Sequence, residues 1–163
     1  MFQAVLTTKD INIVVEIAQE IWPEHYTPII GLEQVEYMLN NFHSSGIIEK
    51  QITQENYRYF IITHNNTNVG YIGVQITTDQ LFLSKIYLRS SVRGLGIGKK
   101  SMLFIKELAQ ENNLSKISLT VNKENKNTIA AYYKLGFVKT GEICADIGRG
   151  FVMDDLKMEL TLI

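Results

Sequence analysis

The sequence has few of the residues that mark secreted or membrane proteins. It contains one cysteine, Cys144, among 163 residues, so no internal disulfide can form. No apolar run approaches the ~20 residues needed to cross a bilayer, and the N-terminus lacks the charged start and apolar core of a signal peptide. We therefore expect a cytoplasmic protein with no membrane partner.

An excess of charge of one sign is also absent. The 16 lysine and arginine residues nearly balance 17 acidic residues, which leaves a net charge of −1 and predicts no nucleic-acid partner. The three histidines show no metal-ligand spacing, so no metal is expected. His43 and His64 are interpreted as a solvated helix end and a turn residue. The length and the 45% hydrophobic content suit a single domain over residues 1–163.

The first third of the chain predicts helices. Apolar residues at a 3.6 period follow Lys9-Asp10 and predict a helix that stops at Trp22-Pro23. The segment 22–31 holds both prolines and predicts a structured loop. Two further helices are expected over residues 32–42 and 47–54.

Alternating β-prone runs dominate the rest of the chain. Strands are expected over 2–6, 57–63, 69–77, 81–88, 115–121, 137–147 and 151–162, with helices from about 98 to 113 and from Asn125. The three strands between residues 57 and 88 predict an antiparallel meander, and the helix that follows them predicts a right-handed parallel crossover. The fold class is therefore mixed α/β, with the sheet antiparallel at both ends and parallel in the middle.

A glycine loop, residues 93–98, lies between a predicted strand and a predicted helix. Glycines let a ligand approach the backbone, and the first helical amides attract anions such as phosphate. A nucleotide P-loop is excluded because Arg93 stands where its first glycine belongs and Lys100 where its hydroxyl belongs. The dinucleotide fingerprint is excluded because the third glycine comes one residue early and the next strand ends in Asn122.

Two motifs together resemble the Gcn5-related N-acetyltransferase (GNAT) superfamily. Arg93, Gly96 and Gly98 fit its pyrophosphate loop, Arg/Gln-x-x-Gly-x-Gly/Ala. Downstream, residues 125–137 resemble its Asn-led helix with Tyr-x-Lys-x-Gly-Phe. The resemblance covers roughly residues 69–163 and implies a GNAT-like acyltransferase fold, with a centrally splayed β-sheet flanked by helices.

The resemblance implies acetyl transfer from acetyl-CoA, as co-substrate, to a primary amine in a ternary complex. It implies that the Leu88 amide stabilises the oxyanion and that Tyr132 assists the leaving thiolate. The cofactor-binding residues that it implies are Ile86, Tyr87, Leu88, Arg93, Gly94, Leu95, Gly96, Ile97, Gly98, Lys99, Asn125, Tyr132 and Lys134.

Two residues of the second motif, Tyr132 and Asn125, have an alternative interpretation. Tyr132 could be a core aromatic residue beside Ile129, and Asn125 could be a helix N-cap as well as a contact to the pantetheine arm. A phenol with an ordinary pKa near 10 donates to a thiolate of pKa near 8.5 only with a penalty of roughly 2 kcal/mol. Tyr132 is therefore expected to hydrogen-bond the developing thiolate and to complete proton transfer late.

The acceptor site and the general base are less defined. The family's acceptor site lies by the loop between its first two helices, which implies the substrate-binding residues Trp22, Glu24, His25 and Tyr26. Ser84 and Lys85 stand where related enzymes often have a carboxylate, so a water-relayed or distant base is expected, with His25 and Glu24 as candidates for the proton acceptor. The carboxylates of Asp146, Asp154 and Asp155 suit a polycation, and solvated turns explain them equally well.

Two classes of function remain open at this point. The first is an N-acetyltransferase whose acceptor is a small-molecule amine, with a polyamine suggested by a faint similarity to bacterial polyamine acetyltransferases, or a protein N-terminus or lysine. The second is a non-catalytic acyl-CoA sensor, which a retained Tyr132 disfavours. The identity of the acceptor, the use of acyl groups other than acetyl and the assembly state, for which a homodimer is one option, are left open.

Overall fold

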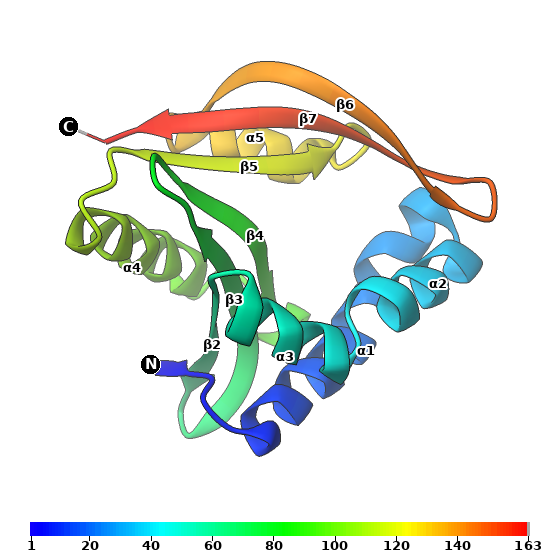
Figure 1. The fold of residues 1–163 in the computed structure, drawn as a ribbon, viewed down its shortest axis with the longest axis horizontal. Helices are drawn as coiled ribbons and strands as arrows, with labels where there is room; N and C mark the ends of the chain where they lie inside the picture. The colour runs from blue at the N-terminus through cyan, green and yellow to red at the C-terminus, as the bar shows by residue number, and fades with distance from the viewer. Residues whose placement is uncertain (163) are drawn as a thin grey trace. The chain divides into compact units, whose positions relative to one another are not determined.

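The computed structural model describes residues 1–162, and Ile163, the last residue of the predicted domain, lies outside the described part. The helices are α1 (Thr8–Ile30), α2 (Leu32–Phe42), α3 (Ser45–Gln54), the short 3₁₀ helix η1 (Ser90–Val92), α4 (Ile97–Glu111) and α5 (Lys126–Lys134) (Figure 1). The strands are β1 (Phe2–Ala4), β2 (Tyr57–His64), β3 (Thr67–Ile76), β4 (Leu81–Leu88), β5 (Lys116–Asn122), β6 (Val138–Gly148) and β7 (Phe151–Thr161).

The strands follow the hydrogen-bonded order β1-β2-β3-β4-β5-β7-β6. Around this sheet the chain forms two compact units. Unit 1 comprises Met1–Ile76 and Leu83–Phe104, and unit 2 comprises Thr77–Phe82 and the chain from Ile105 onward. The mixed α/β fold class, with a helix-flanked sheet, is confirmed, and each unit is described by itself below.

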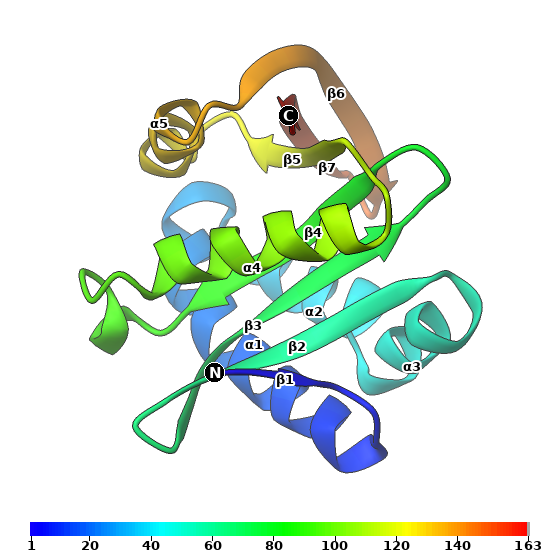
Figure 2. The ribbon, with the colours of Figure 1, turned by 90° about the vertical axis from the view of Figure 1, so that its left-hand side faces the viewer.

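In unit 1 the antiparallel strands β1 to β4 are covered by helices on both faces (Figure 2). The first half of α4 covers one face, where Phe104 stacks on Phe2 at a ring distance of 4.4 Å and meets Phe60 edge-on at 4.9 Å. Helices α1 to α3 cover the other face and bury residues such as Val14 and Ile61. Burial of apolar area on both faces holds this unit together.

The loop predicted over residues 22–31 is wrong, because α1 continues through Pro23 and Pro28 and ends at Gly31. Proline has no backbone N–H. Pro23 and Pro28 therefore leave the carbonyls of Gln19 and Glu24, four residues earlier, without their helical hydrogen bonds. Both of these residues are exposed, so water can satisfy their carbonyls. Apolar positions every four residues continue beyond the first proline and pack on the core, and this packing outweighs the two lost hydrogen bonds.

In unit 2, strands β5, β7 and β6 lie side by side, as Figure 1 shows. Strand β7 pairs antiparallel with β5 from Lys116↔Thr161 to Asn122↔Asp155, and it pairs antiparallel with β6. The first residues of β4 pair parallel with β5 at Leu81↔Ile117 and Phe82↔Ser118, as a crossover through α4 requires. Within residues 1–162, no helix is long and apolar enough to cross a membrane.

Candidate functional site

The glycine loop of unit 1 is fixed at both ends by buried side chains. Val92 and Ile97 are 8% and 1% exposed, whereas residues 93–96 between them are exposed. Gly96 has a φ of +80°, which favours glycine, and its carbonyl accepts from the Lys100 amide at 3.1 Å to begin α4. The preceding amides of this first turn have no intrahelical acceptor, so the turn presents donors and the positive end of the helix dipole.

Gly98 is the second residue of α4 and does not need to be glycine for the protein's own packing. A Cβ built there would meet one atom, Leu88 Cδ1 at 3.8 Å, which is an ordinary contact, and its φ is not positive. Alanine would also favour the helix by roughly 0.5–1 kcal/mol. A glycine at this place therefore fits the close approach of a ligand to the backbone, as the predicted pyrophosphate contact requires.

The structure brings predicted acceptor residues and predicted cofactor residues of unit 1 together. Trp22, Glu24, His25 and Tyr26 lie on α1, and Ile86 to Leu88 end β4. The Tyr26 and Tyr87 hydroxyls are 2.8 Å apart, and the Trp22 ring lies 5.6 Å from the Tyr87 ring. Glu24, by contrast, is exposed.

Four buried aromatic residues form a group that we name the Tyr71 cluster: Trp22, His43, Tyr59 and Tyr71. Trp22 and Tyr71 of this cluster pack against the Tyr87 ring. Trp22 Nε1 donates to the Tyr71 hydroxyl at 2.9 Å, and His43 Nε2 lies 3.0 Å from the same oxygen. An indole N–H can only donate, so the Tyr71 hydroxyl accepts from Trp22, and it also shares a hydrogen bond with His43 Nε2. One hydroxyl thus connects α1, the end of α2 and β3.

The interpretation of His43 as a solvated helix end is wrong, because the residue is 1% exposed and its ring stacks on Trp22 at 5.0 Å. Burial lowers the pKa of His43 well below its ordinary value, and the charge of Lys85 lowers it further. The imidazole is therefore neutral, and its Nδ1 has no hydrogen-bond partner among the described residues.

His25 lies closer to the solvent and to the glycine loop. Its ring meets Tyr26 edge-on at 4.7 Å. Burial lowers the pKa of His25, the positive charge of Arg93 lowers it further, and Glu24 raises it. The charge of a glycine-loop residue, Arg93, thus acts on a histidine of α1.

Lys85 is a partly buried lysine on β4, in a strand of otherwise uncharged residues. Its Nζ donates to Ser84 Oγ at 2.9 Å and lies 5.9 Å above the Tyr57 ring. Burial lowers the pKa of Lys85 to about 8. Within residues 1–162 no ion pair between Lys85 and a carboxylate occurs, so the ammonium form has lost water without gaining an opposite charge.

In unit 2, the predicted tyrosine is oriented by the end of its helix. The Phe137 amide donates to the Tyr132 carbonyl at 3.1 Å and the Gly136 amide to the Tyr133 carbonyl at 3.0 Å, the two bonds of a Schellman cap. The Tyr132 ring lies 5.3 Å from the buried Phe137 ring. Tyr132 is half-buried and Tyr133 is 48% exposed, so the Gly-Phe part of the motif fixes the tyrosine next to the cap.

The other predicted residues of unit 2, Asn125 and Lys134, lie at the two ends of α5. Asn125 occupies the N-cap position of α5 and is 7% exposed, yet its side chain makes no capping hydrogen bond. The N-cap interpretation is thus correct for the position and wrong for the side chain. Lys134 is exposed and ends the helix, where its charge is favourable to the dipole.

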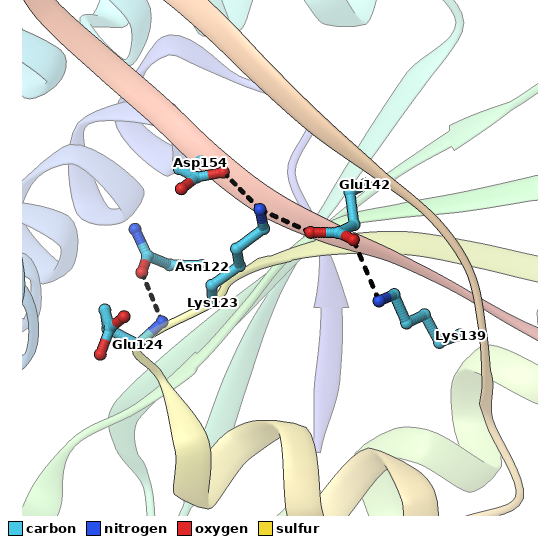
Figure 3. Close-up of polar contacts among 6 residues, drawn as sticks. All are labelled: Asn122, Lys123, Glu124, Lys139, Glu142 and Asp154. Carbon is cyan, nitrogen blue, oxygen red and sulfur yellow. Dashed lines mark hydrogen bonds and ion pairs between the residues drawn. The ribbon is translucent and has the colours of Figure 1, made fainter.

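The three aspartates considered for a polycation have different surroundings. Asp154 pairs with Lys123 at 2.9 Å, and Lys123 also pairs with Glu142 at 2.5 Å (Figure 3). Asp146 accepts from the Gly148 amide at 2.8 Å in the β6–β7 turn. Asp155 is 5% exposed, and burial raises its pKa, while a hydrogen bond with Thr120 lowers it. All three carboxylates therefore have local structural partners.

Sequence reasoning noted Lys85 only as a departure from the family pattern, and it missed Tyr59, Tyr71 and the buried position of His43 in the Tyr71 cluster. The signal for Lys85 was present, since a charged residue inside the apolar run 81–88 is unusual. His43 gave no signal, because only tertiary packing buries it. Among residues 1–162, no group of three or more histidine, cysteine or acidic side chains could hold a metal ion.

Comparisons with known proteins place this arrangement in context. A family model described as "Acetyltransferase (GNAT) family" matches residues 14–137. The chain is 24% identical, over 136 residues, to the spermidine N(1)-acetyltransferase of Thermoplasma acidophilum, a match that spans 81% of this chain and 84% of the relative.

Two solved structures share the fold. The PaiA N-acetyltransferase of Thermoplasma acidophilum, solved in complex with coenzyme A, has a TM-score of 0.77 and 20% identity over 99% of both chains. The ribosomal-protein-S18-alanine N-acetyltransferase of Escherichia coli has a TM-score of 0.72 and 18% identity, over 99% of this chain and 94% of that one.

We predict that Tyr71→Phe destabilises the protein by about 2–4 kcal/mol, because it leaves the Trp22 N–H and the His43 Nε2 buried without a partner. Urea unfolding measures this difference. Tyr133→Phe is the control, since its ring is exposed and the change should stay within about 0.5 kcal/mol. Equal unfolding free energies for Tyr71→Phe and the parent would contradict the role given to the hydroxyl.

Proposed function

The chain belongs to the acetyltransferase (GNAT) family, and from this membership we propose that it transfers the acetyl group of acetyl-CoA to a primary amine of a small molecule. Members of this family use acetyl-CoA, so the enzyme class follows from the family. A polyamine is the first acceptor to consider, because a spermidine N(1)-acetyltransferase is similar over 81% of the chain. We also propose that both units form one catalytic domain. A cytoplasmic location agrees with the free, exposed thiol of Cys144.

The observation that carries the cofactor assignment is the glycine loop of unit 1. The first-turn amides of α4, at Ile97, Gly98 and Lys99, would hold the pyrophosphate, each charge-assisted bond contributing roughly 1.5–3 kcal/mol. The open space at Gly96, where a built Cβ has no neighbour within 4 Å, and the ordinary contact at Gly98 both leave room for this ligand. The neighbouring loop residues Arg93 to Leu95 are exposed and available to it.

The remaining residues follow from the family pattern. When bound, acetyl-CoA supplies an acetyl thioester whose carbonyl carbon is open to attack by an amine. The backbone of Ile86, Tyr87 and Leu88 would pair with the pantetheine arm, and the Leu88 amide would stabilise the oxyanion. The Tyr132 hydroxyl would donate to the leaving sulfur, with Asn125 and Lys134 binding the cofactor beside it. Trp22, Glu24, His25 and Tyr26 would contact the acceptor.

The test of the function is a panel of amines with acetyl-CoA, read by mass spectrometry of the acetylated product. We expect acetylation of spermidine or another small primary amine. Acetylation of a peptide N-terminus alone would favour a protein acceptor, as for the structurally similar S18-alanine enzyme. Tight binding of coenzyme A without any product would favour a non-catalytic sensor and overturn the proposal.

We predict that Gly98→Val weakens coenzyme A binding at least tenfold, a loss of ~1.4 kcal/mol, because its branched side chain stands between backbone and pyrophosphate, where the family's loop has only glycine or alanine. Calorimetric titration measures this affinity. Gly46→Val is the matched control: Gly46 is the second residue of α3, as Gly98 is of α4, and a Cβ there has no neighbour within 4 Å. Circular dichroism should show both variants folded. An unchanged affinity for Gly98→Val would remove the loop from the cofactor site.

We predict that Tyr132→Phe lowers kcat by at least tenfold and leaves coenzyme A affinity unchanged, because it removes the hydroxyl that assists the leaving sulfur and keeps the contact with Phe137. General-acid assistance is typically worth ~10² to 10⁴ in rate. Tyr133→Phe, on the exposed side of the same helix, should behave as the parent. Parent-like turnover of Tyr132→Phe would make Tyr132 a packing residue.

A further inference from the structure

The proposed reaction needs a proton acceptor, because an alkyl amine with a pKa near 10 is almost entirely protonated at pH 7. In β4, at the place where related enzymes often have a carboxylate, this chain has Ser84 and Lys85. The Lys85 Nζ contacts a hydroxyl, Ser84 Oγ at 2.9 Å, and the face of the Tyr57 ring at 5.9 Å. Both contacts stabilise an ammonium only weakly, since neither group carries a negative charge, so burial without a carboxylate partner is what favours the neutral amine.

We propose that Lys85 is the general base of the reaction and takes a proton from the ammonium of the acceptor. This inference rests on the proposed function and assigns a role to a residue that the family pattern leaves unassigned. Lys85 precedes Leu88 by three residues on one strand, which is about 10 Å at the usual rise of ~3.3 Å per residue. Because side chains two residues apart share one face of a strand, Lys85 lies on the same face as Tyr87, whose hydroxyl is 2.8 Å from that of Tyr26. Water molecules can relay the proton from an acceptor beside these rings to Lys85.

The groups around Lys85 support a neutral lysine. From β2, Tyr57 hydrogen-bonds Ser84, and burial raises the pKa of Tyr57, so the phenol carries no negative charge. From the end of α2, His43 is buried and neutral. The negative charge of Glu55 raises the pKa of Tyr57 further. Within residues 1–162, Glu55 forms no ion pair with Lys85. With a pKa of about 8, roughly one Lys85 in ten is neutral at pH 7, far more than an ordinary lysine provides.

The chemical step balances as follows. The Lys85 Nζ lone pair forms an N–H bond as one N–H bond of the acceptor ammonium breaks. The freed amine attacks the thioester carbon, so that a C–N bond forms and the C–S bond breaks. The second proton of the amine reaches the sulfur with the help of Tyr132, which gives the free thiol. Lys85 then releases its proton to water, so one proton leaves for each amide formed.

A polycationic acceptor adds a second requirement. A protonated Lys85 would repel an ammonium beside it, by Coulomb's law, whereas a neutral Lys85 would not. Both binding and deprotonation of such an acceptor therefore need the same neutral lysine. The rate should thus depend on the titration of Lys85 even at acceptor concentrations far below saturation.

The experiment compares Lys85→Arg, which keeps a positive charge but cannot lose its proton, and Lys85→Met, which keeps the stem without an amine. With a strongly basic acceptor, the parent kcat/KM should rise with pH and level off near pH 8. Both variants should lose at least 100-fold and should no longer level off there. Their affinity for coenzyme A should equal that of the parent. Lys50→Met, at an exposed position of α3, is the control and should match the parent.

An acceptor that is already neutral at pH 7, such as methoxyamine, separates a base from a structural residue. With this acceptor both variants should retain activity within about tenfold of the parent, because no proton has to be removed before attack. A loss of 100-fold or more with methoxyamine as well would assign Lys85 a structural role and overturn the proposal. Parent-like activity of Lys85→Arg with a strongly basic amine would overturn it too.

A direct titration keeps the test independent of turnover. In protein labelled with ¹⁵N at lysine Nζ, the signal that disappears in Lys85→Arg should titrate near pH 8. A Lys85 midpoint above pH 10 would overturn the proposal even if the enzyme is active. If no amine is acetylated while Lys85 titrates near pH 8, the proposed function fails and Lys85 loses its role as a base with it.

Discussion

The hydroxyl of Tyr71 is the interaction on which the helical face of unit 1 depends. It is completely buried, and it links the indole of α1 and the imidazole at the end of α2 to a central strand. Because an indole only donates, the Tyr71 oxygen accepts the hydrogen bond from Trp22. Burial raises the pKa of Tyr71 well above its ordinary value, so the phenol keeps its proton. The rings of Tyr26 and Tyr87 pack against Trp22 and Tyr71 of this network.

The sheet, the glycine loop and the Schellman cap could be predicted because local sequence determines them. Alternating apolar residues predict the strands, and apolar residues at helical spacing predict α4 and α5, the two helices that carry the motifs. Glycines at positive φ mark the loop and the end of α5. The extension of α1 could not be predicted in this way. Two prolines normally end a helix, and only the packing of Trp22 and its neighbours on a core made by distant strands outweighs them.

The same reason explains which parts of the site stayed hidden. His43 contacts Trp22, 21 positions earlier, and Tyr71, 28 positions later, and neither separation has a periodic signature. The low basicity of Lys85 comes from burial, which a sequence does not state. By contrast, the loop residues 93–98 and Tyr132 lie within short motifs whose geometry is local. Binding of the cofactor is therefore easier to infer from sequence than the chemistry of the acceptor.

The position of Trp22 gives the protein a built-in optical reporter. It is the only tryptophan in the chain, so the intrinsic indole emission originates from a single ring. That ring is 5% exposed, donates its N–H to Tyr71 and has the rings of Tyr26 and Tyr87 within 6 Å. Indole emission responds to polarity and hydrogen bonding around the ring. A molecule that displaces Tyr26 or Tyr87 therefore changes the light that the unlabelled protein emits, and no dye or engineered probe is needed to observe its arrival.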